Sequence, residues 1–374
     1  MSVLTLSGKE RALRALRFEE TDRIPIHGGW FKHPRFLEIA SGTKMKYGFT
    51  MNAWENPLRA IARAYVNVGA DLTWSLVVPE RWDQLTDRGC LKIHGLNVNR
   101  DPRYNSPDDV IAKYVDSLPD PGDLRDSFNF EAEYDGFVYG ARTAQDEYGD
   151  AMLWLNSGYV PPFHEGLSQF GYSNYLSAII KYKKAMEKYF EHSGEFCRLS
   201  NEVIAKATVE EDLTPFVMVW SDACDDHGPM ASPKILDEIY FPHVKRSVEP
   251  LQSAGIEVFW HCDGNVMPIL DSLMDIGFDG LQGFQEETGV DFTKIMNMRS
   301  KSGRPLIVFG SISVTTTLPF GTVEDVKKDV ERCINLAEGR GGFILCIANV
   351  AQPDVPVENI FAMYEHGRRY GTGK

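Results

Sequence analysis

The stretch EVFWHCDGN, residues 257–265, ends an apolar run with three potential ligands in a row, namely His261, Cys262 and Asp263. Side chains of an extended strand alternate between two sides, so His261 and Asp263 point one way and Cys262 the other. Zinc accepts imidazole nitrogen, carboxylate oxygen and thiolate sulfur, and a catalytic site combines three protein ligands with one open position. We therefore expect His261 and Asp263 to bind zinc together with a cysteine from another strand.

Two cysteines are candidates for the third ligand. Cys224 follows Asp222 on the same face at the end of one apolar run, and Cys346 lies at the end of the last run. For either thiol, buried packing is the alternative. For the site, the alternative is a hydrogen-bonded His261 that holds the Asp263 loop without any metal. The spacing is compatible with each of these interpretations.

Other polar residues at strand ends suggest acid–base or binding roles. Asp225 and Asp226 are adjacent, so their side chains diverge, and we expect Asp226 to be catalytic. His164, in the loop PPFHEG, can donate a proton to a substrate oxygen or can be a solvated loop residue. Glu286, close to the end of another run, has the same two interpretations, and we expect it to contact the substrate.

Eight short apolar runs must position these residues. They are nearly continuous in apolar side chains, as expected for strands covered on both faces, and comprise residues 23–29, 71–78, 151–156, 216–222, 257–263, 280–286, 305–311 and 342–349. Helix-start signals precede intervening segments at Ser7 with Glu10, Ser232 with Pro233 and Thr322 with Asp325. This repeated β–α pattern, with no G-x-G-x-x-G after an early strand, predicts an α/β fold, a (β/α)8 TIM-like barrel.

We interpret residues 1–374 as one barrel domain with an elaborated N-terminal half. Residues 85–150 are rich in Asp, Gly, Pro and Tyr and show weak periodicity, which is typical of an elaborated connection. Barrels of this type place their chemistry at the carboxyl ends of the strands. The polar clusters at 220–228, 260–265 and 346–354 are therefore expected to lie at that face.

Charge and hydropathy argue against two classes of protein. With 39 basic and 53 acidic residues the formal net charge is −14, so we expect no nucleic-acid partner. No stretch approaches the roughly 20 apolar residues that span a bilayer, and we expect a soluble, cytoplasmic protein with no membrane contact. The cysteines, at positions 90, 197, 224, 262, 333 and 346, form no C-x-x-C pair, which favours reduced thiols.

Five segments in register resemble the uroporphyrinogen decarboxylase superfamily. They are KERALRALRFEETDRIPI, DDHGPMASPKILDEIYFPHVKR, WHCDGNVMPIL, FGSISVTTTLPFGTVEDVKKDV and GGFILCIANVAQPDVPVENIFAMYEHGRRYG, and together they span almost the whole chain. The resemblance implies an (α/β)8 barrel with its site in the carboxyl-terminal cleft, and it suggests a homodimer. The superfamily includes porphyrinogen decarboxylases and cobamide-dependent methyltransferases, some of which demethylate methoxylated aromatics onto a corrinoid protein.

The first strand departs from the pattern of the decarboxylases. Those enzymes carry an arginine-rich R-Q-A-G-R segment, whereas this chain reads HGGWFKHPRF. Lys32 and Arg35 supply far fewer charge-assisted contacts than the carboxylates of a tetrapyrrole need. Trp30 and Trp220, near strand ends, suit a flat apolar substrate, with core packing as the alternative role for each ring.

The strand-end histidine resembles that of the zinc methyltransferases in the superfamily, with two departures. Their common pattern is H-x-C-G-N, and here Asp263 stands at the cysteine position. Their second cysteine falls near Asn349, with Cys346 three residues earlier, and we expect Asn349 to contact the substrate. These departures argue against the branch that makes methyl-coenzyme M.

The sequence thus favours a methyltransferase of the O-demethylase type, which moves a methyl group from a methoxylated, aromatic small molecule to the cobalt of a separate corrinoid protein. The chain contains no D-x-H-x-x-G corrinoid motif, which assigns the corrinoid to a partner. Zinc, or an acid group such as His164 or Asp226, would assist the departing oxygen. The alternative is a metal-free decarboxylase acting on a carboxylated substrate.

Overall fold

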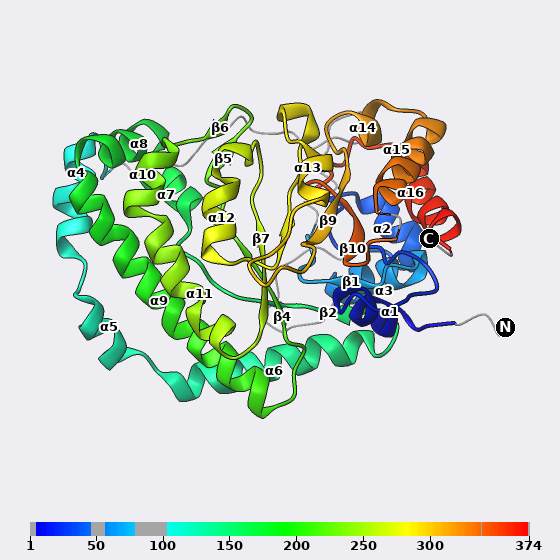
Figure 1. Ribbon diagram of the computed structural model, residues 1–374, viewed down its shortest axis with the longest axis horizontal. Helices are drawn as coiled ribbons and strands as arrows, with labels where there is room; N and C mark the ends of the chain where they lie inside the picture. The colour runs from blue at the N-terminus through cyan, green and yellow to red at the C-terminus, as the bar shows by residue number, and fades with distance from the viewer. Residues whose placement is uncertain (1–4, 46–56, 79–102, 338, 373–374) are drawn as a thin grey trace.

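The computed structural model describes residues 5–45, 57–78, 103–337 and 339–372. Strands run through the centre of the molecule, with α9 (Lys183–Glu210) and α11 (Phe241–Ser253) on one side (Figure 1). On the other side lie α15 (Val323–Leu336) and α16 (Val357–Tyr370). Helices therefore cover both sides of the central strands, as the apolar runs predict.

The central strands pair in parallel around a ring. Their bounds are β1 Leu72–Thr73, β2 Leu153–Trp154, β3 Asn156–Ser157, β4 Phe216–Trp220, β7 Glu257–His261, β8 Gly280–Gln282, β9 Ile307–Ile312 and β10 Phe343–Ile347. One six-stranded sheet has the order β10-β9-β8-β7-β4-β3, and β1 pairs with β2. A short antiparallel hairpin, β5 (Cys224–Asp225) with β6 (Gly228–Pro229), follows β4.

Single backbone bridges join these two sheets. Ile26 pairs in parallel with Leu345 of β10, and His27 pairs in parallel with Leu72 of β1. On the other side, β2 and β3 are consecutive pieces of one run that are separated only by Leu155. All eight predicted runs thus take neighbouring places in a parallel arrangement, which is the pairing of a (β/α)8 barrel.

The remaining helices are α1 Gly8–Leu16, α2 Pro34–Ser41, α3 Leu58–Val68, α4 Pro107–Lys113, α5 Pro121–Ser127, α6 Phe130–Tyr148, α7 Phe163–Phe170, α8 Tyr172–Lys181, α10 Pro233–Ile239, α12 Leu270–Ile276, α13 Phe292–Met296 and α14 Thr317–Phe320. Short 3-10 turns lie at Val115–Ser117, Met267–Ile269 and Glu286–Thr288. The predicted start signals are N-caps: the side chains of Ser7, Ser232 and Thr322 accept backbone N–H groups of α1, α10 and α15.

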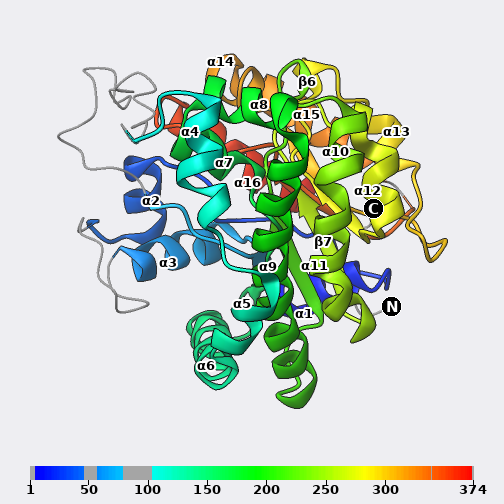
Figure 2. The ribbon, with the colours of Figure 1, turned by 90° about the vertical axis from the view of Figure 1, so that its left-hand side faces the viewer.

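The elaboration of the N-terminal half is helical where the structure describes it. Between residues 103 and 150 the chain forms α4, a 3-10 turn, α5 and the 19-residue α6, while residues 85–102 of the predicted connection lie outside the described part. Helix α6 runs along the end of the molecule at which β4 begins, and Figure 2 shows it end-on there, away from the rim that carries β6. Helix α6 therefore leaves the opposite face of the barrel to the functional residues.

Aromatic side chains fill the barrel interior below that face. Phe216, Phe259 and Phe309 come from three strands, with ring centroids 5.9 Å and 5.4 Å apart in turn, and Trp74 lies 5.3 Å from Phe309. All four are almost completely buried. The barrel is a packed core rather than a pore, so polar chemistry is confined to its ends.

A buried ion-pair network closes the barrel at the N-terminal ends of the strands. Asp71, immediately before β1, accepts from Arg11 of α1 and from Arg23, each at 2.6 Å, and also from the backbone N–H of Ile26 at 2.8 Å. The Asp71 side chain is 1% exposed. One carboxylate thus ties together α1, the first run and β1, where the backbone pairing consists of single bridges.

We expect the substitution Asp71→Asn to destabilise the protein by about 3 kcal/mol, because it removes the carboxylate that pairs with Arg23 and one of the two carboxylates, Asp22 and Asp71, that pair with the buried Arg11. Urea unfolding followed by circular dichroism measures the change. The matched control is Glu147→Gln, which breaks an ion pair with the exposed Arg59 and is expected to cost less than about 1 kcal/mol. Equal losses in the two variants would contradict a structural role for the buried network.

Asp279, immediately before β8, gives a second prediction. Burial raises its pKa from the ordinary 3.8 to about 6, although its Oδ2 accepts the backbone N–H of Val258 at 3.1 Å. The folded state therefore binds a proton on the Asp279 carboxyl group more tightly than the unfolded chain does. Stability is consequently lost as pH rises from about 4 through 6.

The substitution Asp279→Asn removes this ionisation and keeps a carbonyl oxygen as acceptor. We expect the variant to gain stability over the parent protein on the order of 1 kcal/mol at pH 7 and little at pH 4. Urea midpoints measured from pH 4 to pH 8 test this. A constant difference across that range would show that the carboxyl group is not the cause.

Candidate metal centre at the barrel mouth

Three potential metal ligands meet at the carboxyl ends of the strands. His261 is the last residue of β7, where it pairs with Trp220 of β4 and Gln282 of β8. Asp222 and Asp263 each lie two residues beyond these paired positions, so they project to the same side as His261. Their ligand atoms all lie within 4.8 Å of one another. The Nε2 of His261 is 3.4 Å from Oδ1 of Asp263 and 3.9 Å from Oδ1 of Asp222.

The side chain of Gln282 determines which nitrogen of His261 carries a proton. Its Nε2 donates to the backbone oxygens of Ile347 and Ala348, each at 3.1 Å. Because these carbonyls only accept, the Oε1 of Gln282 must face the other way, where it contacts Nδ1 of His261. Oε1 also only accepts, so Nδ1 carries the proton. In the neutral form of the ring, the lone pair of Nε2 then faces the two aspartates.

Asp263 presents a buried oxygen without a hydrogen-bond partner in the described part of the chain. This atom, Oδ1, is the one 3.4 Å from the ring nitrogen of His261. Burial is the main influence on the pKa of Asp263 and raises it; His261 opposes the rise and Asp222 adds to it. A nitrogen lone pair and a carboxylate oxygen at this distance repel each other unless a proton or a cation lies between them. The geometry therefore provides a place for positive charge.

The donor set fits zinc. One imidazole nitrogen and two carboxylate oxygens are ligand types that zinc accepts, and three protein ligands leave the open position of a catalytic site. Gln282 supplies the outer hydrogen bond that a zinc-binding histidine ordinarily makes through its second nitrogen. His261 and Asp263 lie together as strand alternation predicts, and the third member of the cluster is Asp222.

Cys224 and Cys346 lie outside this cluster. The thiol of Cys224 is buried against Cys262, and this contact, followed by burial, raises the pKa of Cys262 well above its ordinary value. Burial likewise raises the pKa of Cys346, whose sulfur lies 3.9 Å from the amide nitrogen of Gln282. Zinc binds thiolates rather than thiols, so ligation by a cysteine stays a prediction. The five cysteines of the described chain are free and buried, and Cys90 lies outside that part.

The backbone holds the two aspartates together. The N–H of Asp263 donates to Oδ1 of Asp222 at 3.0 Å, and the N–H of Asn265 donates to the carbonyl oxygen of Asp225 at 2.9 Å. Between them, Gly264 has a φ of +78°, and a Cβ at this position would lie 2.4 Å from the same Asp225 oxygen. The loop after β7 is thereby fixed to the β5–β6 hairpin, and glycine is required at the point of contact.

Aromatic rings form a wall beside the cluster. The ring of Trp30 meets the ring of His261 edge to face, with centroids 5.4 Å apart, and its Nε1 donates to Oγ of Ser75 at 2.7 Å. His27 packs on Trp74 at 4.2 Å. Burial, with a smaller contribution from His261, lowers the pKa of His27 to about 3, so this ring is neutral. The predicted residue Trp30 therefore contributes to an apolar wall suited to a flat ring.

Two further predicted residues, Trp220 and His164, line a hollow that adjoins the cluster. The hollow has a volume of about 380 Å³ and is bounded by residues 158–165, α9 and the end of β4. Trp220 is 42% exposed there. His164 is close enough to Asp263 to influence its pKa, and its buried Nδ1 has no hydrogen-bond partner among the described residues. The Nδ1 of this imidazole therefore has hydrogen-bonding capacity that the described residues do not use.

The other predicted site residues have separate environments. Asp226 is exposed in the turn between β5 and β6 and lies outside the cluster. Glu286 accepts two hydrogen bonds from Arg332 of α15, at 2.8 Å and 3.2 Å, so its carboxylate is engaged in an ion pair. Asn349, two residues beyond β10, forms a side-chain hydrogen bond that lowers the pKa of Asp263. Contact of each of these residues with a substrate stays a prediction.

Sequence reasoning missed Gln282 and gave His27 no role. The signal for Gln282 was a polar residue inside the apolar run GLQGFQE, but only the pairing of β7 with β8 shows that it faces His261. His27 also follows an apolar run, and its partners Trp30 and Trp74 come from two different segments. Each contact joins residues from different segments of the chain, so the sequence of one segment does not reveal it.

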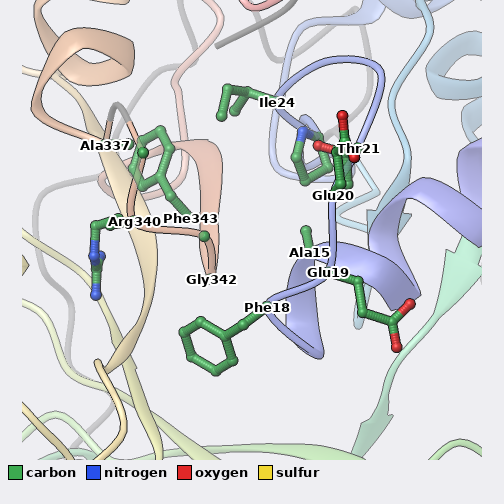
Figure 3. A pocket seen from close by; sticks show the side chains of 13 residues that line it. Ala15, Phe18, Glu19, Glu20, Thr21, Ile24, Ala337, Arg340, Gly342 and Phe343 are labelled. Carbon is green, nitrogen blue, oxygen red and sulfur yellow. The ribbon is translucent and has the colours of Figure 1, made fainter. Parts of the chain in front are cut away.

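A second hollow, of about 360 Å³, lies at the other end of the barrel between the end of α1 and the loop before β10 (Figure 3). Arg340 lies on one side of it and Glu19 and Glu20 on the other. The guanidinium of Arg340 donates to the carbonyl oxygen of Leu306. Burial lowers the pKa of Arg340 to about 10, so it remains charged at neutral pH. This hollow brings together no cluster comparable to that at the mouth.

Comparison with protein families identifies the class. Residues 163–370 match the family model described as uroporphyrinogen decarboxylase, which is more than half of the chain. The protein therefore belongs to the uroporphyrinogen decarboxylase family. The matched region contains His164, the metal-ligand cluster and Gln282. No curated protein matches the chain.

Among solved structures, the chain is similar to a methyltransferase from Methanosarcina mazei. The sequence identity is 18% and the TM-score is 0.59, with 98% of this chain and 99% of the other covered. At this identity the likeness supports the fold, a barrel over the whole chain length. In the described residues no helix is long and apolar enough to cross a membrane.

The cluster predicts that protein purified without chelator carries about one zinc ion per chain. We expect His261→Ala and Asp263→Asn to lose the metal. Gln282→Leu, which removes only the outer hydrogen bond, should weaken zinc binding by about 10- to 100-fold. Metal content is measured by mass spectrometry, and affinity by competition with a chromophoric chelator.

Asp226→Asn is the matched control, because it removes an exposed carboxylate from the adjacent hairpin and leaves the three ligands intact. It should bind zinc like the parent protein. Zinc retained in Asp263→Asn, or lost equally in Asp226→Asn, would exclude the proposed ligand set.

Proposed function

We propose that the protein is a corrinoid-dependent methyltransferase that takes the methyl group of a methoxylated aromatic compound and passes it to the cobalt of a corrinoid carried by a separate protein. The observation that supports this most is the pair of facing acceptors, His261 Nε2 and Asp263 Oδ1, beside an aromatic wall at the barrel mouth. Such a pair attracts positive charge to the point where a leaving oxygen would develop negative charge.

The reaction asks for charge neutralisation more than for a protein nucleophile. The methyl C–O bond breaks, its electron pair stays on the oxygen, and a cobalt–carbon bond forms with the reduced corrinoid of the partner, which is the nucleophile. Zinc, when held by Asp222, His261 and Asp263, supplies a Lewis acid for the departing oxygen. The fixed tautomer of His261 and the backbone link between the aspartates keep these donor atoms in place before substrate arrives.

The residues around the cluster have complementary tasks in this proposal. Trp30 orients a planar ring through its buried edge-to-face position beside His261. His164, whose Nδ1 is buried and unpaired among the described residues, orients or protonates the ether oxygen. Asp226 was the other candidate for that task, but its exposed position in the hairpin turn favours His164.

A decarboxylase acting on a polycarboxylated substrate has less support. It needs arginines that face the mouth, and the buried guanidinium groups of Arg11 and Arg23 are paired with Asp71 at the opposite end of the barrel. Arg332, near the rim, is paired with Glu286 and Asp329. The proposed methyl transfer instead requires potential metal ligands and an aromatic wall, which the mouth contains.

The test is incubation of the zinc-loaded protein with a reduced corrinoid protein and methoxybenzenes, followed by the absorbance of methyl-cobalt. We expect transfer to fall by at least about 100-fold in His164→Gln, consistent with loss of a general acid. In Asp226→Asn it should stay within about twofold. Thermal unfolding of each variant serves as the control for folding.

No methyl-cobalt with any methoxylated ring, from protein that retains its zinc, would contradict the proposed reaction. The reverse result for the two variants, a loss in Asp226→Asn alone, would transfer the acid–base task to the hairpin.

A further inference from the structure

The lining of the hollow beside the cluster indicates what kind of ligand the hollow can bind. Its lining includes the side chains of Tyr159, His164, Glu165, His192, Phe196 and Trp220. A volume of about 380 Å³ is at the small end of the range for ligand pockets and suits one aromatic ring with a short side chain. Two of these residues connect the hollow to the metal-ligand cluster. Trp220 of β4 lies opposite His261 of β7 in the strand pairing, and the charge of His164 lowers the pKa of Asp263.

Three large aromatic side chains of this lining are exposed to an unusual degree. Tyr159 is 48% exposed, Phe196 is 47% exposed and Trp220 is 42% exposed. They come from three different elements, namely the loop after β3, helix α9 and the end of β4. Exposed apolar surface gathered around one hollow is typical of a binding site, and aromatic faces attract cations as well as flat rings.

The charge of the lining is negative. Glu165 is its one acidic residue, is exposed, and forms no ion pair with another described residue. His192 is partly buried; burial lowers its pKa, and the ring is neutral near pH 7. Lys188, whose charge also acts on His192, is outside the lining and donates to the carbonyl oxygen of Leu118 at 3.1 Å. No Lys or Arg side chain lines the hollow.

We infer that the methoxylated aromatic compound bound at this site carries a protonated amine, held by Glu165 and by the rings of Tyr159, Phe196 and Trp220. The inference rests on the proposed function and specifies its substrate class. A carboxylate at the rim pairs with the ammonium group, and the rings surround it. A ring with a carboxylate substituent is rejected, because Glu165 repels it and no cation of the lining compensates.

Binding tests this without any methyl transfer. Three probes share one dimethoxybenzene ring: 2-(3,4-dimethoxyphenyl)ethylamine, 1,2-dimethoxybenzene and 3,4-dimethoxybenzoate. Isothermal titration at pH 7 with the zinc-loaded protein should rank the amine first, by about fivefold or more over the neutral ring, with the benzoate weakest. The advantage of the amine should shrink when the ionic strength rises from 0.02 M to 0.3 M.

Glu165→Gln should abolish the preference for the amine and leave the affinity for the neutral ring unchanged. The matched control is Glu187→Gln, which removes an exposed carboxylate from the same helix, α9, that contributes His192 and Phe196 but does not line the hollow. Phe196→Leu should weaken the amine more than the neutral ring. All three substituted positions are exposed, so we expect the fold to persist, which circular dichroism verifies.

A benzoate that binds as tightly as the amine, a preference unaffected by Glu165→Gln, or no measurable binding of the amine would each overturn the inference. Failure of the reaction is a distinct outcome. If the amine binds selectively but no methyl-cobalt forms, the inference about the hollow stands and the proposed methyl transfer fails. If all three rings are demethylated at equal rates, the transfer stands and the inference fails.

Discussion

The amide of Gln282 has only one orientation available, because two backbone carbonyl oxygens accept hydrogen bonds from its NH2 group. Its oxygen must then accept from the Nδ1–H of His261, and in the neutral ring the lone pair of the other nitrogen faces Asp222 and Asp263. This single constraint turns three polar side chains into a preorganised site for positive charge. An amide costs little to bury when all its groups are paired, so the arrangement is also compatible with the packed interior beneath it.

The two ends of the barrel use buried polarity in opposite ways. At the N-terminal ends of the strands, Asp71 is saturated by two guanidinium groups and a backbone N–H, and it serves closure of the fold. At the mouth, Asp263 has an oxygen without a hydrogen-bond partner among the described residues. The layer of Phe216, Phe259 and Phe309 separates the two ends. Stability and reactivity are thereby assigned to different ends of one set of strands, as in other barrels of this type.

The strands and the placement of His261 and Asp263 on one side of β7 were predictable because each depends on a local rule. Continuous apolar runs indicated the eight strands, and alternation along β7 placed His261 and Asp263 on one side. The third member of the cluster and Gln282 depend on how β4, β7 and β8 align, which no single segment encodes. The weak periodicity of residues 85–150 has a physical cause in α6, which buries only Ala141, Ala144 and Tyr148 and so has little apolar stripe to detect.

The close approach of Gly264 to the Asp225 carbonyl couples the position of the β5–β6 hairpin to that of the loop after β7. The hairpin lies on the rim, and its backbone is attached to the loop that begins at Asp263. Because of this attachment, a shift of the hairpin backbone would also shift the loop that carries Asp263. Insertions in the hairpin turn would therefore alter the electrostatics of the mouth, even though the turn residues Asp226 and His227 are exposed and lie outside the cluster.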